Sequence, residues 1–404
     1  MEKVAIINTI FGYDSTGMLA KNLYEYGKEN GYEVFAFYGR GQKETSDHIV
    51  RIDSVIDVAI HKVMTLLTGY QGRFSSRATR RMIKTIELNN INKIILLNLH
   101  GYYLNEPLLF RYLKQNHRET IYITADEYAG LGKCCYSNNC TKYIDKCEKC
   151  PQKHVYPQSL FFDRASKLFE QKKEEYKDNE SLIFLGPETN LQVFRRSALT
   201  KNKRMKSISW GIDLQTYKYG IDENVYKKYN IPRDKIIILT VAPFSSERKG
   251  VQKYFFPIAK RLEGTKYHFI NVGYDGNQKN EDIPNNMTTI RYIKDQKELA
   301  KIYSISDLYV LASTTDTMPI SCLISFACCT PVCCFYTSGL VNLAEKNNLA
   351  VRYCTEINID ALEKTIRNSR KKDQSTMDAC RNLANAKYSQ DAFNRAVYES
   401  FERE

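Results

Sequence analysis

The chain alternates short, continuous apolar runs with longer segments in which apolar residues recur every three or four positions. Apolar runs bounded by turn residues predict buried strands, and the periodic segments predict covering helices. A strand at 4–8 is followed by the loop "GYDSTG" and a helix over 18–31, where Leu19, Leu23 and Tyr26 share one face. The other predicted strands are 32–39, 91–100, 120–126, 181–187, 235–242, 267–273, 288–293 and 307–313.

This order of elements predicts an α/β protein with two Rossmann-like, doubly wound domains. Strands that alternate with helices favour parallel sheets covered on both faces. We expect an N-terminal domain over 1–212 with a cysteine-rich insert at 134–150, a C-terminal domain over 213–384 and an amphipathic terminal helix within 385–404. Two such domains that face each other leave a cleft at the carboxyl ends of their strands, where ligands bind.

The length and the apolar content support this organisation. At 404 residues the chain exceeds one ordinary core, because domains usually hold roughly 100–200 residues. No run approaches the roughly 20 apolar residues of a membrane-spanning helix. The start of the chain leads directly into a strand and has no signal-peptide pattern. We therefore expect a cytoplasmic protein with reduced thiols.

The formal net charge of +13 favours anionic partners. No nucleic-acid-binding module is found, so nucleic acid is not expected as a partner. Segment 61–87 combines apolar and basic residues, and two interpretations stay open. It lies on an anionic membrane surface at the inner face, or it is a solvated basic helix over the N-terminal sheet. Its basic residues are Arg73, Arg77, Arg80, Arg81 and Lys84.

Several blocks, read in order, resemble a known family. They are "GYDSTG", "LHGYYLN", a cysteine block closing with "CPQK" and "YPQS", "WGIDLQ", "SSERKG" and "ACCTPV". Together they resemble the bacterial GT-B glycosyltransferases of capsular, exopolysaccharide and colanic-acid synthesis. More narrowly, the chain is similar to the cysteine-containing branch of glycosyltransferase family 4.

The resemblance implies a division of labour between the domains. The first would bind the acceptor, a glycan or lipid-linked saccharide, and the second a UDP- or GDP-sugar. The terminal helix would cross back to the first domain. Transfer of a hexose-type unit would retain the anomeric configuration, and a partner glycosyltransferase is a further expectation.

Glycosyl transfer needs fixed positive charge beside the leaving diphosphate. No Asp-x-Asp motif is found, so no catalytic metal is expected. Arg248 and Lys249 in "SSERKG" follow a predicted strand and precede a helix, which puts both cations at the carboxyl edge of the second sheet. The alternative is a solvated pair on an ordinary loop.

Backbone groups at helix starts are the other candidates for donor binding, since free N–H groups there attract phosphate. One such start follows Pro319, another lies near residue 338, and a third follows the glycine loop of the first domain. An ordinary strand–helix turn is the alternative for the glycine loop. The residues concerned are Met318, Pro319, Ile320, Ser338, Gly339, Gly12, Ser15, Thr16 and Gly17.

The resemblance also assigns acidic and histidine positions, and this chain departs from several of them. Asp126 ends a strand where the family has a His-Asp pair, but Ala125 takes the place of that histidine. His100 and Tyr102 are candidates for the acceptor pocket, although a lone histidine is more often structural. Asp316 matches the acidic residue that contacts the donor sugar.

The second acidic position of the same motif, which holds the ribose, falls at Ile324. A further Glu of the family is missing from "TSGLVN". The chain is therefore expected to be a glycosyltransferase that holds its donor differently, or a degenerate, non-catalytic subunit. A phosphorylase-like enzyme is a poor fit, because no context for a pyridoxal lysine is found.

The cysteine block has the spacing C-x5-C-x6-C-x2-C, and its last pair is a common zinc half-site. Four thiolates would close a tetrahedral structural zinc site, with free thiols or two disulfides as alternatives. Cys135 is expected to be a filler beside the set. The predicted ligands are Cys134, Cys140, Cys147 and Cys150. Five cysteines of "CLISFACCTPVCCF" are predicted to be small buried hydrophobic residues.

Overall fold

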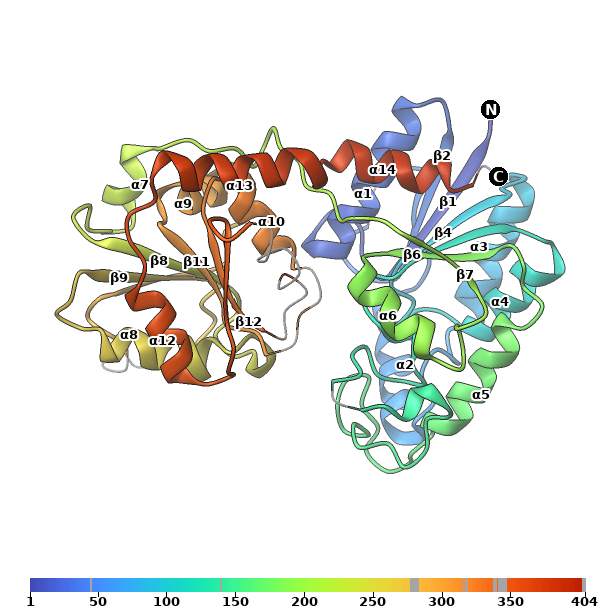
Figure 1. The fold of residues 1–404 in the computed structure, drawn as a ribbon. Coiled ribbons are helices and arrows are strands. Elements are labelled where there is room, and N and C mark those ends of the chain that lie inside the picture. The colour runs from blue at the N-terminus through green and yellow to red at the C-terminus, as the bar shows by residue number, and fades with distance from the viewer. Residues whose placement is uncertain are drawn as a thin grey trace. The chain divides into compact units, whose positions relative to one another are not determined.

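The chain folds into two compact units (Figure 1). Unit 1 comprises Met1–Ser209 with Phe393–Glu404, and unit 2 comprises Trp210–Ala392. Each unit is built on one parallel sheet, which confirms the predicted fold class. The computed structural model describes residues 1–43, 46–138, 140–276, 283–314, 316, 319–336, 340 and 347–401.

The sheet of unit 1 has seven strands in the order β3-β2-β1-β4-β5-β6-β7. The order reverses between β1 and β4, which are neighbours and pair in parallel. The strands are β1 (Lys3–Asn8), β2 (Glu33–Tyr38), β3 (Ile49–Arg51), β4 (Lys93–Leu96), β5 (Glu119–Ile123), β6 (Leu182–Gly186) and β7 (Arg204–Ser207). The helices are α1 (Asp14–Glu29), α2 (Val55–Thr68), α3 (Ser76–Leu88), α4 (Glu106–Gln115), α5 (Ala165–Tyr176) and α6 (Glu188–Arg196).

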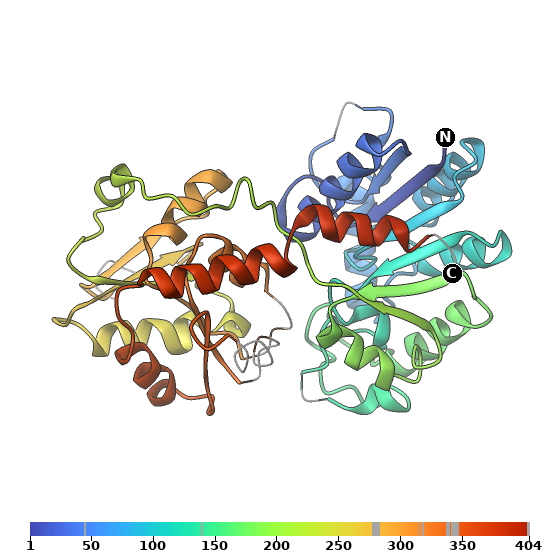
Figure 2. The same cartoon turned by 45° about the horizontal axis from the view of Figure 1, so that its top comes forward.

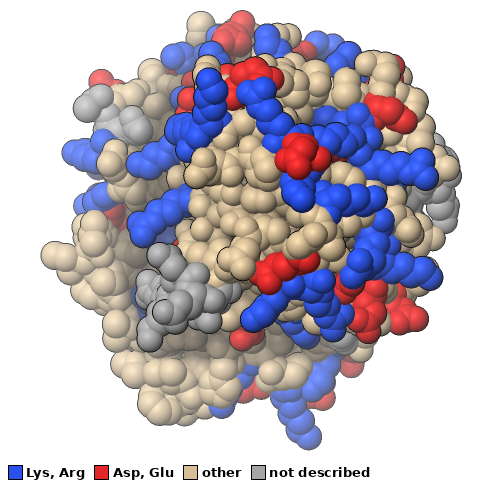
Figure 3. Space-filling model, turned by 90° about the vertical axis from the view of Figure 1, so that its left-hand side faces the viewer, with Lys and Arg blue, Asp and Glu red and all other residues tan. Residues whose placement is uncertain are grey.

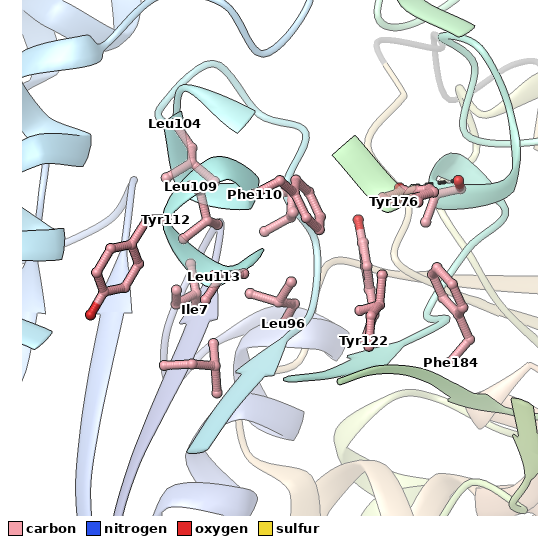
Figure 4. Packing of buried hydrophobic residues seen from close by; sticks show 14 of the residues in the cluster. Ile7, Leu96, Leu104, Leu109, Phe110, Tyr112, Leu113, Tyr122, Tyr176 and Phe184 are labelled. Atoms are coloured by element: carbon pink, nitrogen blue, oxygen red, sulfur yellow. Dashed lines mark hydrogen bonds between the residues drawn. The ribbon is translucent and has the colours of Figure 1, made fainter. Parts of the chain in front are cut away.

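The core of unit 1 forms where helices cover the central strands, whose side chains are buried on both faces. Figure 4 shows Leu113 of α4 close to Ile7 of β1 and Leu96 of β4. Tyr122 stacks on Phe184 of the next strand, with ring centroids 5.7 Å apart. This packing fixes the strand ends from which the site residues of unit 1 project.

The sheet of unit 2 has six strands in the order β10-β9-β8-β11-β12-β13, and it reverses between β8 and β11. The strands are β8 (Ile236–Val241), β9 (Tyr267–Val272), β10 (Met287–Ile290), β11 (Leu308–Leu311), β12 (Val332–Phe335) and β13 (Val351–Cys354). The helices are α7 (Glu223–Lys228), α8 (Phe256–Arg261), α9 (Gln296–Ile305), α10 (Ile320–Ala327), α12 (Ile359–Arg367) and α13 (Gln374–Lys387).

The helix α14 (Gln390–Glu399) packs on unit 1, as Figure 2 shows beside α1. The Tyr398 hydroxyl donates a hydrogen bond of 2.8 Å to the carbonyl oxygen of Leu23. The Tyr398 ring lies 4.8 Å from the ring of Tyr32 and 5.5 Å from that of Tyr26, measured between centroids. The C-terminal helix therefore completes the unit in which the chain begins.

Charged side chains are spread over the face of the molecule that Figure 3 shows. On this face, Lys and Arg side chains are scattered among Asp and Glu. None of the helices in the described ranges is long and apolar enough to cross a membrane.

Candidate active site

Arg248, Lys249 and Asp316 come together at the point where the strand order of unit 2 reverses. The two cations follow β8, and the carboxylate follows β11, the neighbour of β8. Lys249 Nζ lies 2.7 Å and Arg248 Nη1 3.3 Å from the same Asp316 carboxylate oxygen. Carboxyl ends of parallel strands at such a reversal form the usual ligand crevice of an open α/β sheet. The predicted cations therefore lie at a suitable edge, held by the predicted acid.

A glycine lets the two loops approach this closely. Gly250 has a φ of 67°, in the left-handed region. A Cβ atom there would overlap the carbonyl oxygen of Ala312 in the loop that leads to Asp316. A side chain at position 250 would therefore separate the cations from the carboxylate.

Helix α10 begins directly after this loop, with Pro319 in the N-cap position and Ile320 as its first residue. The predicted helix start is thus observed. Ile324 lies inside the helix and is 7% exposed. Met318, Ser338 and Gly339 lie outside the described residues.

In unit 1, His100 and Asp126 lie in the loops that follow the neighbouring strands β4 and β5, which end at Leu96 and Ile123. A hydrogen bond of 2.7 Å joins His100 Nε2 to an Asp126 carboxylate oxygen, and one of 3.1 Å joins Nδ1 to the Tyr156 hydroxyl. The other Asp126 oxygen accepts the backbone N–H of Tyr128 at 2.9 Å. A His-Asp pair is therefore present, although Ala125 replaces the histidine that precedes the aspartate in the resembling family.

Thr9 fixes the start of the His100 loop. Its hydroxyl lies 2.9 Å from the carbonyl oxygen of Asn98 and 2.5 Å from that of His100. Thr9 follows β1, so the histidine lies where the strand order of unit 1 reverses. Tyr102 is only 4% exposed, and its ring packs 5.9 Å from that of Tyr156.

Sequence reasoning missed two members of this group. Tyr156 lies in "YPQS", one of the blocks that resemble the family, but the sequence assigned no role to this tyrosine. Cys135, interpreted as a filler, brings its sulfur within 4.8 Å of ligand atoms of both His100 and Asp126. Burial raises the pKa of the Cys135 thiol well above its ordinary value.

The glycine loop of unit 1 differs from its prediction. Helix α1 begins at Asp14 rather than at residue 18, so Ser15, Thr16 and Gly17 belong to its first turn. Gly17 is buried, and a Cβ atom there would lie 3.1 Å from Ile10 Cγ1. The lack of space for a side chain beside Ile10, and not a flexible loop, explains why residue 17 is a glycine. The N–H of Gly12 is bonded to the carbonyl oxygen of Gly17 at 2.9 Å.

The four predicted zinc ligands line one small cavity of about 20 Å³, which has room for about one water molecule. None of the twelve cysteines, all within the described ranges, forms a disulfide. Among the described residues, these four thiols do not form a group close enough together to be a candidate metal site as they stand. The set suits zinc chemically, but the thiols would have to move closer together to coordinate it. The four predicted ligands are Cys134, Cys140, Cys147 and Cys150.

A buried lysine holds the loop around this cavity. Lys133 is 2% exposed, and its ammonium group donates to the carbonyl oxygens of Gln152, Lys153 and Val155 at 3.2–3.3 Å. Burial lowers its pKa, while the nearby thiols, led by Cys150, act in the opposite direction. A cation in this position would offset the charge of bound thiolates.

The basic segment 61–87 divides into α2 and α3. Arg73 cannot bind an anionic membrane surface, because its guanidinium group is paired with Glu175 at 2.8 Å and its side chain is only 13% exposed. Arg77, Arg80 and Lys84 on α3 are exposed, while Ala78, Met82 and Ile86 of that helix pack inward.

Residues 222–389 match the family model described as "Glycosyl transferases group 1". A stretch of 125 residues is 27% identical to the putative colanic acid biosynthesis glycosyl transferase WcaC of Escherichia coli strain K12. That match covers 29% of this chain and only 30% of the relative.

Several solved structures match almost the whole chain, among them the following two. The first is WaaG, a glycosyltransferase involved in lipopolysaccharide biosynthesis, with a TM-score of 0.67, 11% identity and coverage of 99% of this chain and 100% of that one. The second is Anabaena Alr3699/HepE in complex with UDP, with a TM-score of 0.63, 11% identity and coverage of 98% and 99%. The chain therefore has a GT-B fold, whose second unit matches the glycosyl transferases of group 1.

Proposed function

We propose that the protein is a retaining glycosyltransferase of the cysteine-containing branch of family 4. It moves a hexose-type unit from a UDP- or GDP-sugar to a hydroxyl group of a surface-polysaccharide or lipid-linked glycan intermediate. The observation that carries the proposal is the meeting of Arg248, Lys249 and Asp316 at the strand reversal of unit 2. The group 1 match and the UDP bound to a protein of the same fold support the donor class.

The cations act on the leaving group. Negative charge develops on the diphosphate as the bond to the sugar breaks, and fixed positive groups stabilise it. Arg248 binds two phosphate oxygens at once, and Lys249 supplies a point charge. The N-terminus of α10 adds unpaired N–H groups after Pro319.

Asp316 holds the cations in place before the donor arrives. Its side chain is 12% exposed, so the shared carboxylate fixes both cations at this strand reversal. When the diphosphate binds, the carboxylate turns to a hydroxyl group of the donor sugar. The acceptor attacks on the face that the diphosphate leaves, so no protein nucleophile is needed.

The acceptor side belongs to unit 1. Asp126 accepts a hydrogen bond from the acceptor hydroxyl, and His100 orients the carboxylate. The four thiols beside this loop would hold a structural zinc ion, which would keep the loop in shape. A closed four-thiolate site has no open position for substrate, so the zinc has no part in the transfer.

Ile324 sets an expected limit on donor affinity. A carboxylate in its place would accept a charge-assisted hydrogen bond worth roughly 1.5–3 kcal/mol from the ribose. Its loss corresponds to roughly 10- to 150-fold weaker donor binding. The donor is therefore held mainly through its diphosphate.

Donor binding and hydrolysis test the proposal. Purified protein is titrated with a panel of UDP- and GDP-sugars, and slow hydrolysis is followed by mass spectrometry. One donor should bind saturably, and Arg248→Ala with Lys249→Ala should abolish both binding and turnover. Lys253→Ala, which removes an exposed cation four residues further along the chain, is the matched control and should keep both.

A second candidate is a non-catalytic GT-B subunit that binds a glycan or partners an active transferase. Ala125 and Ile324 favour it, because both replace polar groups of the family pattern. Absence of binding across the donor panel, with the fold intact, would support this candidate over the enzyme.

A further inference from the structure

Helix α2 carries most of its large apolar residues on the side that faces solvent, although Val58 packs against the core of unit 1. Its buried side chains are His61 and Thr65. A surface helix normally shows the reverse arrangement, with the apolar face toward the core. The exposed apolar residues are Val55 (71%), Ile56 (72%), Ile60 (54%), Val63 (51%), Met64 (36%) and Leu67 (43%).

These residues form a continuous stripe. Residues 56, 60, 63 and 67 are three or four positions apart, which puts them on one helix face. The stripe extends over roughly 20 Å at 1.5 Å per residue. Among the exposed positions of this helix, only Asp57 and Lys62 are charged.

A second exposed apolar segment lies against the end of the same helix, at the lower end of unit 1 in Figure 1. The N–H of Leu160 donates to the carbonyl oxygen of Leu66 at 2.9 Å, which fixes this segment beside α2. Leu160 is 48%, Phe161 63% and Phe162 49% exposed. Together, the exposed apolar residues of α2 and of segment 160–162 form one surface, the apolar face.

Cations accompany the two phenylalanines. Lys153 Nζ lies 3.4 Å from the carbonyl oxygen of Phe161, and the Arg164 guanidinium lies 4.9 Å from the ring centroid of Phe162. The nearby Asp163 uses both carboxylate oxygens on backbone N–H groups, those of residues 150 and 165. This end of the apolar face is therefore basic.

The other end of α2 opens on a cavity of about 430 Å³. Its lining includes the cations Lys43, Arg51 and Arg81. Among the described residues that line it, the one carboxylate is Asp53, which accepts hydrogen bonds from the Ser75 hydroxyl and from the backbone N–H at 54. Three cations beside one engaged carboxylate suit an anion such as a phosphate.

We propose that the apolar face docks on an anionic phospholipid surface, with a headgroup phosphate in the cationic cavity. Aliphatic and Phe side chains enter the interfacial layer, and the cations at both ends meet the headgroups. The basic charge at both ends of the apolar face favours an anionic lipid surface over a second copy of this chain. The basic ends of two copies would repel each other. The inference goes beyond the proposed function, because docking requires neither donor nor acceptor.

The test is co-sedimentation of the full chain with vesicles of phosphatidylcholine alone or mixed with phosphatidylglycerol. We expect binding to the mixed vesicles that weakens as salt is raised. Ile60→Glu with Val63→Glu should weaken it at least tenfold. Leu88→Glu with Ile221→Glu, at exposed sites elsewhere and with the same change of charge, should leave it unchanged.

A separate arm probes the cavity. Lys43→Glu with Arg81→Glu should remove the preference for phosphatidylglycerol, and inorganic phosphate should not compete if the lipid surface is the source of the anion. Circular dichroism and thermal unfolding check that each variant is folded. Equal vesicle binding by the Ile60/Val63 variant and the wild type would overturn the proposal. So would a dimer, seen by light scattering, that this variant abolishes.

Discussion

The Nε2 atom of His100 and a carboxylate oxygen of Asp126 lie 2.7 Å apart, although the residues are 26 positions apart in the chain. Neither residue has another charged partner among the ion pairs formed by the described residues. The two side chains are 12% and 11% exposed, so the hydrogen bond is largely shielded from water. Removal of either member leaves the other without its partner.

We expect His100→Ala and Asp126→Ala each to lower transfer to the acceptor by roughly 10- to 150-fold, the loss of one charge-assisted hydrogen bond. Donor affinity should stay unchanged, because the diphosphate cations belong to unit 2. Tyr156→Phe, which removes only the bond to Nδ1, should cost less than tenfold. The measurement is kcat/KM for the acceptor beside a donor titration. If the double variant loses the full product of the two single losses, the residues do not act as a pair.

The four thiols that line the cysteine cavity predict that each chain binds one zinc ion. Burial raises the pKa of Cys134 to about 12 and that of Cys147 to about 11. These thiols are therefore protonated at neutral pH without a metal, and zinc must displace their protons. Zinc affinity should fall as the pH is lowered.

Elemental analysis checks this prediction. Cys147→Ser and Cys150→Ser should lose the metal and lower the unfolding temperature, and a chelator should do the same to the wild type. Cys135→Ser should keep its zinc, since its sulfur lies toward His100. A wild-type protein without zinc after growth in zinc-supplemented medium would contradict the prediction.

Acid should weaken the packing of α2. Burial lowers the pKa of His61 to about 4, whereas an ordinary histidine titrates near 6.5. The unfolded chain therefore binds the extra proton first as pH falls. The stability that depends on neutral His61 is fully present above about pH 6.5 and is lost as pH approaches 4. The upper bound is about 3 kcal/mol, at about 1.4 kcal/mol per pKa unit.

Urea unfolding of the wild type and His61→Asn at pH 7 and pH 4.5 measures this effect. The variant should be less stable at pH 7 and should lose less stability on acidification. The buried His268 has its pKa lowered to about 4 in both proteins, so its contribution cancels in the comparison. Equal losses in the two proteins would show that His61 does not cause the effect.

The contact between α14 and α1 should contribute to the stability of unit 1. Gly27→Ala would place a Cβ atom on the Tyr398 hydroxyl and 2.7 Å from Val34 Cγ2. We expect a loss of about 1–3 kcal/mol from such overpacking. Tyr398→Phe should cost about 1 kcal/mol, because the Leu23 carbonyl loses its hydrogen bond. Tyr292→Phe, at a side chain that is 67% exposed, is the control.

Both sheets are predictable from the sequence because their central strands are buried on two faces. Such strands read as uninterrupted apolar runs, as β8 does in "KIIILTVA". Strand β12 is harder to recognise, since "VCCF" lies in one long apolar stretch with α10. Its burial was predictable, and all its residues are fully buried, but apolar character alone does not separate helix from strand.

The site was only partly predictable, for a reason of topology. The sequence indicates that His100 and Asp126 each follow a strand, but the order of strands in the sheet decides that they meet. The same limit applies to Asp316 and its two cations. The outward face of α2 was left as one of two interpretations of segment 61–87, because helical periodicity identifies an apolar stripe without saying which side faces the core.

The return of α14 to unit 1 delays the completion of that unit until the end of synthesis. The ribosome releases residues 1–209 first, but the surface of α1 around Gly27 stays open until α14 emerges. All of unit 2 is translated in between, which takes roughly ten seconds or more at about 5–20 residues per second. The nascent first unit is therefore an incomplete intermediate with exposed apolar surface, and the last helix closes it.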